Sequence, residues 1–262
     1  MLMFITIIND CHCPNARGRQ EIRVASLFNC PTNFIKINSD LEAAGNLVDT
    51  LEAGLGEKGI ILVNVAPRNG EAKKWKNGTP FGYFYYGQTL VVTTLDGHTL
   101  SLLKKLNEKP KIKIVNLKET VKLNFSSPEK IISTQFRSLE FSPRLASWIR
   151  RGKKIKEESW DIEKTPDLGA LIWCVDNFGN LKTSIIEGTA EAEKIKSRLE
   201  KRGFKFIDSL KNCPDNQTCL IKGSSGLKNK KFLEIVINGD SASQKLNLGT
   251  GSDLNKIQCP KV

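Results

Sequence analysis

The sequence is poor in histidine and methionine, with two residues of each among 262. Two histidines leave little material for a histidine-based catalytic triad, and both His12 and His98 fall in turn-like sequence. The chain also lacks the P-loop, GxGxxG, HExxH and GxSxG motifs. These absences exclude the enzyme classes that such motifs define.

Long hydrophobic runs are also missing, because no apolar stretch reaches the roughly 18 residues of a membrane helix. The apolar opening MLMFITIIND has no basic segment before it and ends at Asp10, so we expect a buried strand and not a signal peptide. An odd count of seven cysteines then indicates reduced thiols and a cytoplasmic protein. The spacing of Cys11, Cys13 and Cys30 is atypical of structural zinc sites, and we expect no metal.

Positive charge is in excess, with 40 Lys and Arg against 28 Asp and Glu and a net charge of +12. A basic chain can bind nucleic acid or another polyanion. The lysines are scattered, however, and only residues 150–156 (RRGKKIK) form a dense run. This pattern favours a solvated surface, so nucleic-acid binding is the weaker alternative.

Two apolar runs, 2–9 and 60–65, are typical of buried parallel strands. Between them, Ser39 and Glu42 form a capping box in front of a helix with apolar residues at helical spacing. Residues 10–19 are expected to form a polar loop. Strand, helix and strand predict a β-α-β unit with a parallel sheet.

A charged stretch that ends in Thr-Pro-Asp predicts a boundary between two domains, because the pattern of expected elements changes after it. We therefore predict an α/β protein with an N-terminal domain, whose sheet is mixed and partly parallel, at 1–152. A linker is expected at 153–167, and a smaller, mostly β domain at 168–262. The strands expected in this second domain are 168–175, 181–186, 204–207, 219–222 and 231–237, with one helix at 189–202.

Two loops are candidate sites. Ligands of α/β sheets gather at the carboxyl ends of strands, where Asp10 and the 66–70 loop lie. A carboxylate can accept both hydroxyls of a ribose, although Asp10 is equally a typical turn residue. In the loop DNFGN (176–180), Asn180 can pair with a base edge and Asp176 with an ammonium, but a plain hairpin turn fits as well.

Six segments together resemble the SAM hydroxide adenosyltransferases and the related SAM-dependent chlorinases and fluorinases, where SAM is S-adenosyl-L-methionine. The resemblance covers nearly the whole chain and implies a Rossmann-like N-terminal domain, a β-barrel-like C-terminal domain and a homotrimer with SAM between subunits. It also implies no cofactor beyond SAM as substrate, while the lack of long apolar runs leads us to expect no membrane partner. The segments are IINDC (7–11), GIILVNVAPRNG (59–70), LDGHTLSLL (95–103), STQFRSLEFSP (133–143), VDNFGNLKTSI (175–185) and FLEIVINGDSAS (232–243).

The resemblance also implies roles for single residues. Asp10 matches the residue that holds the ribose hydroxyls, Asp176 the one near the methionine amine, and Asn180 the one that reads adenine. The other residues expected to bind substrate are Phe178 in the same loop, Asn69, Ser225 and Asn238.

The departures from the family concern activation of the nucleophile. Hydrolytic members carry an Asp–Arg–His set, and the Asp position here is Ala66 and the His position Phe136. The Arg position falls at Lys73 or Lys74. Arg137 stands where the family has Gly or Ser, so Lys73 and Arg137 are the candidate catalytic cations.

Three hypotheses follow, in order of preference. The first is an enzyme that displaces methionine from the 5′ carbon of SAM with hydroxide, water or another anion such as halide. The second is a degenerate SAM or adenosine binder without turnover. The third is a basic nucleic-acid-associated protein. The sequence leaves the nucleophile open.

Overall fold

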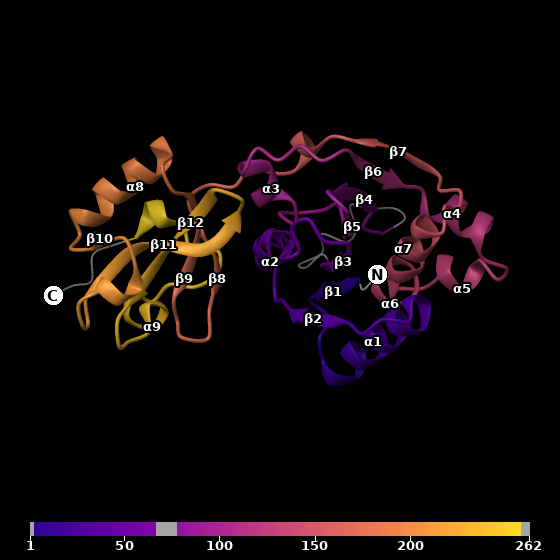
Figure 1. Cartoon of the computed structure of the whole chain (residues 1–262), viewed down its shortest axis with the longest axis horizontal. Coiled ribbons are helices and arrows are strands. Elements are labelled where there is room, and N and C mark those ends of the chain that lie inside the picture. Colours follow the sequence, from indigo (N-terminus) through magenta and orange to yellow (C-terminus); the bar gives the residue numbers. More distant parts are fainter. Residues whose placement is uncertain (1–2, 67–77, 258–262) are drawn as a thin grey trace. The chain divides into compact units, whose positions relative to one another are not determined.

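The computed structural model describes residues 3–66 and 78–257, and the chain divides into two compact units, Met1–Pro166 and Asp167–Val262 (Figure 1). The first unit combines helices with a seven-stranded mixed sheet, and the second is built mainly on a five-stranded sheet. This arrangement confirms the predicted fold class.

The first unit carries the following described elements in chain order. They are β1 (Phe4–Asn9), α1 (Pro14–Phe28), β2 (Asn33–Lys36), α2 (Asp40–Ala53), β3 (Gly59–Asn64), β4 (Phe81–Tyr86), β5 (Thr89–Thr94), α3 (Ser101–Lys105), β6 (Ile112–Val115), α4 (Leu117–Asn124), α5 (Glu129–Ile132), α6 (Arg137–Glu140), α7 (Ser142–Arg150), β7 (Glu157–Trp160) and the 3-10 helix η2 (Ile162–Lys164).

The first sheet has the strand order β2-β1-β3-β5-β4-β6-β7. Strands β2, β1, β3 and β5 are parallel, whereas β4, β6 and β7 add an antiparallel edge. Helix α2 packs on β1 and β3 from one side, and α7 packs on β3 and β5 from the other (Figure 1). Because helices cover both faces, β1 and β3 are apolar along almost their whole length.

Two segments of this unit differ from the sequence predictions. Part of the expected polar loop 10–19 is the start of α1, which begins at Pro14, a residue that suits the first helical turn. Its inner face shows little hydrophobic pattern, because Gln20 and Val24 are its only fully buried residues. The expected linker 153–167 instead contributes β7, which pairs antiparallel with β6, and the second unit begins at Asp167.

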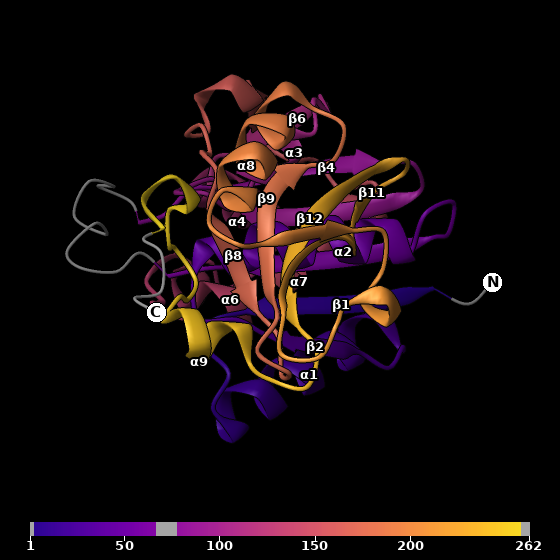
Figure 2. The same ribbon diagram turned by 90° about the vertical axis from the view of Figure 1, so that its left-hand side faces the viewer.

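The second unit has the sheet order β10-β11-β12-β9-β8. Figure 2 shows β9, β11 and β12 with α8 in front of them, and α8 packs on β9 and β10. Its described strands form a sheet with two edges and not a closed barrel. The elements are β8 (Ile172–Val175), β9 (Leu181–Ile186), α8 (Ala190–Glu200), β10 (Lys205–Ile207), η3 (Leu210–Asn212), β11 (Thr218–Leu227), β12 (Lys230–Ile237), α9 (Ala242–Leu246) and η4 (Leu254–Lys256).

Candidate functional site

The first candidate site lies where the direction of strand addition reverses in the parallel sheet. Strand β1 has β2 on one side and β3 on the other, and β5 lies beyond β3, so strands are added in opposite directions from the boundary between β1 and β3. Such switch points are where open α/β sheets bind ligands. Asp10 follows β1 directly and is buried, with its Oδ2 atom accepting the Ala66 N–H at 2.9 Å.

Two buried amides lie directly behind Asp10. Asn9, the last residue of β1, and Gln20 of α1 are joined by a hydrogen bond from Asn9 Nδ2 to Gln20 Oε1 at 2.5 Å. Gln20 was not among the predicted site residues. Its burial could have been predicted, because Gln20 lies one helical turn before Val24 and so shares its inward face.

Two predicted site residues, Asn69 and Lys73, lie outside the described residues, as does Lys74. The remaining candidate cation, Arg137, begins α6. Its Nη1 atom donates to the Thr79 carbonyl oxygen at 3.4 Å, and burial lowers the pKa of the guanidinium without removing its charge at neutral pH.

Arg137 lines a cleft of about 1240 Å³. Its walls come from the start of β4, from β6 and β7, and from α4. The other cationic side chains on the lining are those of Lys118, Lys122 and Lys156, and the acidic ones are Glu119, Glu157 and Glu158. A half-buried guanidinium among further cations can hold a small anion.

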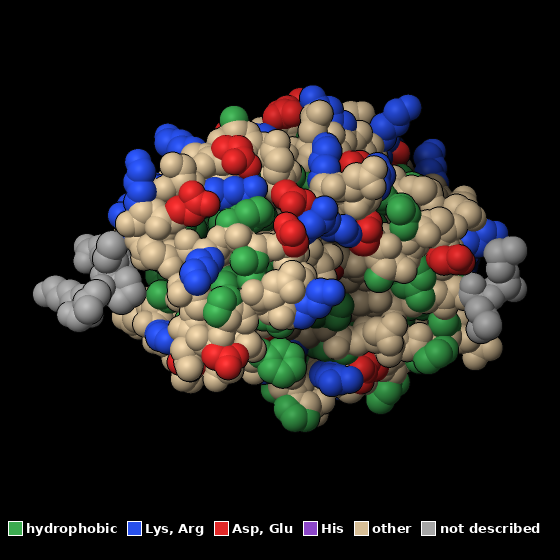
Figure 3. All heavy atoms as spheres, turned by 60° about the vertical axis from the view of Figure 1, so that its left-hand side comes forward, with side chains coloured by type: hydrophobic (Ala, Val, Ile, Leu, Met, Phe, Trp, Pro, Cys, Tyr) green, Lys and Arg blue, Asp and Glu red, His purple; other side chains and the backbone are tan. Residues whose placement is uncertain are grey.

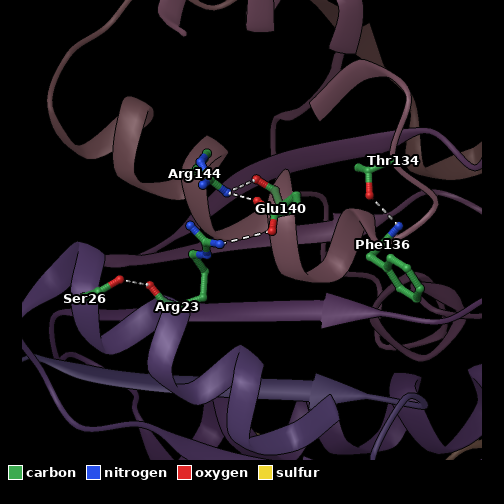
Figure 4. A network of polar contacts seen from close by, with 6 residues as sticks. All are labelled: Arg23, Ser26, Thr134, Phe136, Glu140 and Arg144. Carbon is green, nitrogen blue, oxygen red and sulfur yellow. Dashed lines mark hydrogen bonds and ion pairs between the residues drawn. The ribbon is translucent and has the colours of Figure 1, made fainter. Parts of the chain in front are cut away.

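Phe136, at the family's His position, precedes Arg137 and leaves 61% of its surface exposed. Its backbone N–H bonds to Thr134 Oγ1 at 3.0 Å (Figure 4). The short helix that follows is anchored by Glu140, which pairs with Arg23 of α1 at 3.0 Å and with Arg144 of α7 at 2.6 Å. Phe136 therefore sits on a well-fixed segment but offers no proton-transferring group.

The second candidate site is the turn 176–180 between β8 and β9. Asp176 Oδ1 accepts the N–H groups of Phe178 and Asn180, both at 2.9 Å, and Asp176 Oδ2 accepts Asn180 Nδ2 at 2.9 Å. Gly179 has a φ of +85°, and a side chain there would collide with Ser241. The turn is thus rigid, and it presents the Phe178 ring with 73% of its surface exposed.

Ser225 and Asn238 are held by internal contacts. Ser225 Oγ, on β11, accepts from Lys182 Nζ at 2.7 Å and is buried. The Asn238 amide, just after β12, donates to Asp215 Oδ1 at 2.7 Å and to the Cys213 carbonyl oxygen at 3.2 Å. Lys182 was not among the predicted site residues. It lies two residues after Asn180, within the VDNFGNLKTSI segment.

The structure therefore brings Asp10 together with Ala66, and Asp176 with Phe178 and Asn180. The first of these groups belongs to the first unit, and the second belongs to the second unit. Within the described part of the chain, no three His, Cys, Asp or Glu side chains are placed to hold a metal ion. Cys11 and Cys13 are exposed, and the Cys30 thiol donates to the Met3 carbonyl oxygen at 3.0 Å.

Two surface properties bear on the class of ligand. Across residues 3–66 and 78–257, no helix is both long and apolar enough to cross a bilayer. On the face drawn in Figure 3, Lys and Arg side chains are interspersed with Asp and Glu and form no continuous basic patch. The net charge of +12 therefore does not concentrate on that face.

The fold defines a two-unit α/β protein with a carboxylate-bearing loop in each unit and a topological switch point in its first sheet. Residues 170–255 match the family model of the SAM hydroxide adenosyltransferase C-terminal domain. The match covers most of the second unit, which begins at Asp167.

Comparison with solved structures shows the same fold in two bacterial proteins. An uncharacterized conserved protein from Thermotoga maritima has a TM-score of 0.64 and 14% identity, over 95% of this chain and 98% of that one. A conserved hypothetical protein from Thermus thermophilus has a TM-score of 0.59 and 15% identity, over 95% of this chain and 97% of that one. No curated protein sequence matches the chain.

Proposed function

We propose that the protein binds S-adenosyl-L-methionine and cleaves it by nucleophilic displacement at the 5′ carbon. Hydroxide or water as the nucleophile gives adenosine and L-methionine, and another anion such as halide gives a 5′-substituted adenosine. The observation that carries the proposal is the turn 176–180, because it lies inside the matched domain and holds Asp176, Phe178 and Asn180 in one arrangement.

In this reaction the protein has a limited chemical task. The leaving group is methionine, a neutral thioether released from a sulfonium, so the site must place the nucleophile in line and exclude bulk water. Asp10 would hold the ribose hydroxyls, Asp176 the methionine ammonium and Asn180 the adenine edge. From the resemblance to the family, we also propose a cytoplasmic homotrimer with the substrate bound between subunits.

The nucleophile is the open part of the proposal. A water molecule gains from a general base, and neither Ala66 nor Phe136 can act as one. Arg137 can hold and orient an anion that is already ionised. The site therefore suits a preformed anion at least as well as water.

The test is product analysis. The protein is incubated with SAM alone and with chloride, bromide or iodide, and adenosine is separated from 5′-halo-adenosines by chromatography. We expect adenosine in the first case or a halo-adenosine in one of the others. Formation of no nucleoside product under any anion would contradict the cleavage proposal.

The loss of the family's Asp and His positions favours one alternative, a protein that binds SAM or adenosine without turnover. Calorimetry separates the two. Tight SAM binding with no product after long incubation would establish the binder, whereas turnover would exclude it.

A further inference from the structure

The amides of Asn9 and Gln20 lie almost fully inside the first unit, with 1% and 3% of their surfaces exposed. Buried amides are costly unless their donors and acceptors are paired. A methionine or leucine would fill the same space on α1 without that cost. The presence of two amides at this place therefore calls for a reason beyond packing.

Their hydrogen bonds converge on the segment that carries Asp10. Asn9 Nδ2 donates to Gln20 Oε1 at 2.5 Å, while Asn9 Oδ1 accepts the Cys11 N–H at 2.8 Å and Asn64 Nδ2 at 3.4 Å. Gln20 Nε2 donates to the Cys11 carbonyl oxygen at 3.0 Å and to the Ala16 carbonyl oxygen at 3.2 Å.

Both backbone polar groups of Cys11 are thus held by these two side chains. Cys11 follows Asp10 directly, so the pair fixes the direction in which the chain leaves β1. On its other side Asp10 is held by Ala66, whose N–H bonds its carboxylate at 2.9 Å. The orientation of the Asp10 carboxylate is therefore set by α1 through the amides and by the loop after β3.

We infer that Gln20 is a positioning residue for Asp10, acting through Asn9 and the Cys11 backbone to aim the carboxylate at a vicinal diol of the bound nucleoside. This inference rests on the proposed function, since it assigns the recognition of the ribose in the same site. Gln20 itself does not touch the ligand. Its role predicts a defect confined to the diol, which a purely structural role would not produce.

The experiment compares two ligands that differ only in the hydroxyls, adenosine and 2′,3′-dideoxyadenosine, on the full chain by calorimetry. The variants are Gln20→Met, which keeps the side-chain length and removes all three hydrogen bonds, and Asp10→Asn. Gln88→Met serves as the matched control, because Gln88 lies on the surface and bonds only to the Gly56 carbonyl oxygen among the contacts of the described residues.

We expect Gln20→Met to weaken adenosine binding about tenfold and to leave dideoxyadenosine binding unchanged within about twofold. The variant carrying both Gln20→Met and Asp10→Asn should bind adenosine no more weakly than Asp10→Asn alone, because both changes remove the same interaction. Gln88→Met should behave as the parent with both ligands.

Three outcomes would overturn the inference. Equal losses for both ligands in Gln20→Met would show a general structural effect, and additive losses in the double variant would show independent roles. Parent-like adenosine binding by Gln20→Met, with the Asp10→Asn defect present, would refute positioning and leave the proposed function intact. A parent protein that binds neither adenosine nor SAM would refute the proposed function itself.

Thermal unfolding of each variant shows whether Gln20→Met folds. If it does not, Gln20→Glu takes its place, since it keeps the acceptor for Asn9 and loses the donors to Cys11 and Ala16. The same loss restricted to adenosine is then expected, and its absence would again overturn the inference.

Discussion

The two units hold their candidate residues in different ways. In the second unit, Asp176 closes its own turn, and its carboxylate accepts hydrogen bonds from residues two and four positions further along the chain. In the first unit, Asp10 depends on Ala66, 56 residues away, and on the buried amides of β1 and α1. One site is local in sequence and the other is assembled from distant segments.

The match to the C-terminal domain of the SAM hydroxide adenosyltransferases, at residues 170–255, includes the local turn. A turn that is complete within five residues can be recognised as a short sequence motif. A site assembled from distant segments can keep its geometry while single residue types change, as at Ala66 and Phe136.

Replacing Arg137 should have the largest effect, and the effect should be on kcat. If Arg137 holds the anion, Arg137→Met should lower kcat by about 100-fold or more, since a buried charge that stabilises the reacting anion is typically worth this much. The KM for SAM should change little. Steady-state kinetics with Arg150→Met, which replaces an exposed arginine at the end of α7, provides the control. An unchanged kcat would move the nucleophile site away from Arg137.

Asp10→Ala should weaken SAM binding by roughly 3 kcal/mol, about 100-fold, because two charge-assisted hydrogen bonds to the ribose are lost. Calorimetry measures the change, and Asp208→Ala, an acidic residue of the other unit, is the control. If Asp10→Ala binds SAM with the affinity of the parent, the nucleoside binds elsewhere and the site assembled around Asp10 is not the ribose site.

Asn180→Ala should have a smaller effect, about 1 kcal/mol, and should reduce the preference for adenine over guanine or inosine analogues of the nucleoside. The same variant removes the bond to Asp176, so its melting temperature should fall by a few degrees. Asn177→Ala, in the same turn, is the matched control. Equal loss of affinity for all bases would mean that Asn180 supports the turn and does not read the base.

Much of the fold could be predicted from the sequence because its signals are local. Strands β1 and β3 are continuous apolar runs, and Ser39 accepts the Glu42 N–H at 3.1 Å as the capping box predicts. Helix α1 was missed because its inner face contains Gln20, which a hydrophobic pattern counts as polar. Strand β7 was missed because its residues, EESW, form a charged edge strand that is largely exposed.

The assembled site could not be predicted in the same way. The contact of Arg137 with Thr79 joins residues 58 positions apart, and no pattern of residue types specifies that distance. The position of Asp10 beside Ala66 follows only once β1 and β3 are known to be parallel neighbours in register, with Asn9 opposite Asn64. Sequence could place Asp10 at a strand end but could not supply the partners that orient it.

A further expected effect concerns the core of the second unit and its response to alkaline pH. Cys219 is fully buried in a cluster with Cys213, Ile221 and Val236, and burial raises the pKa of its thiol to about 12. The unfolded chain ionises this thiol near pH ~8.5, so the folded state loses stability as the pH rises from there toward 12. Below about pH 8 the contribution is complete.

Ionisation of one thiol lowers the free energy of unfolding by at most about 1.4 kcal/mol per pH unit in this window. Chemical unfolding at about pH 7.5 and about pH 9.5 measures it, and Cys219→Val should show a flatter dependence than the parent. Ile221→Val is the control, because Ile221 lies in the same cluster and has no titratable group. If Cys219→Val keeps the parent's slope, the alkaline loss of stability arises elsewhere in the chain.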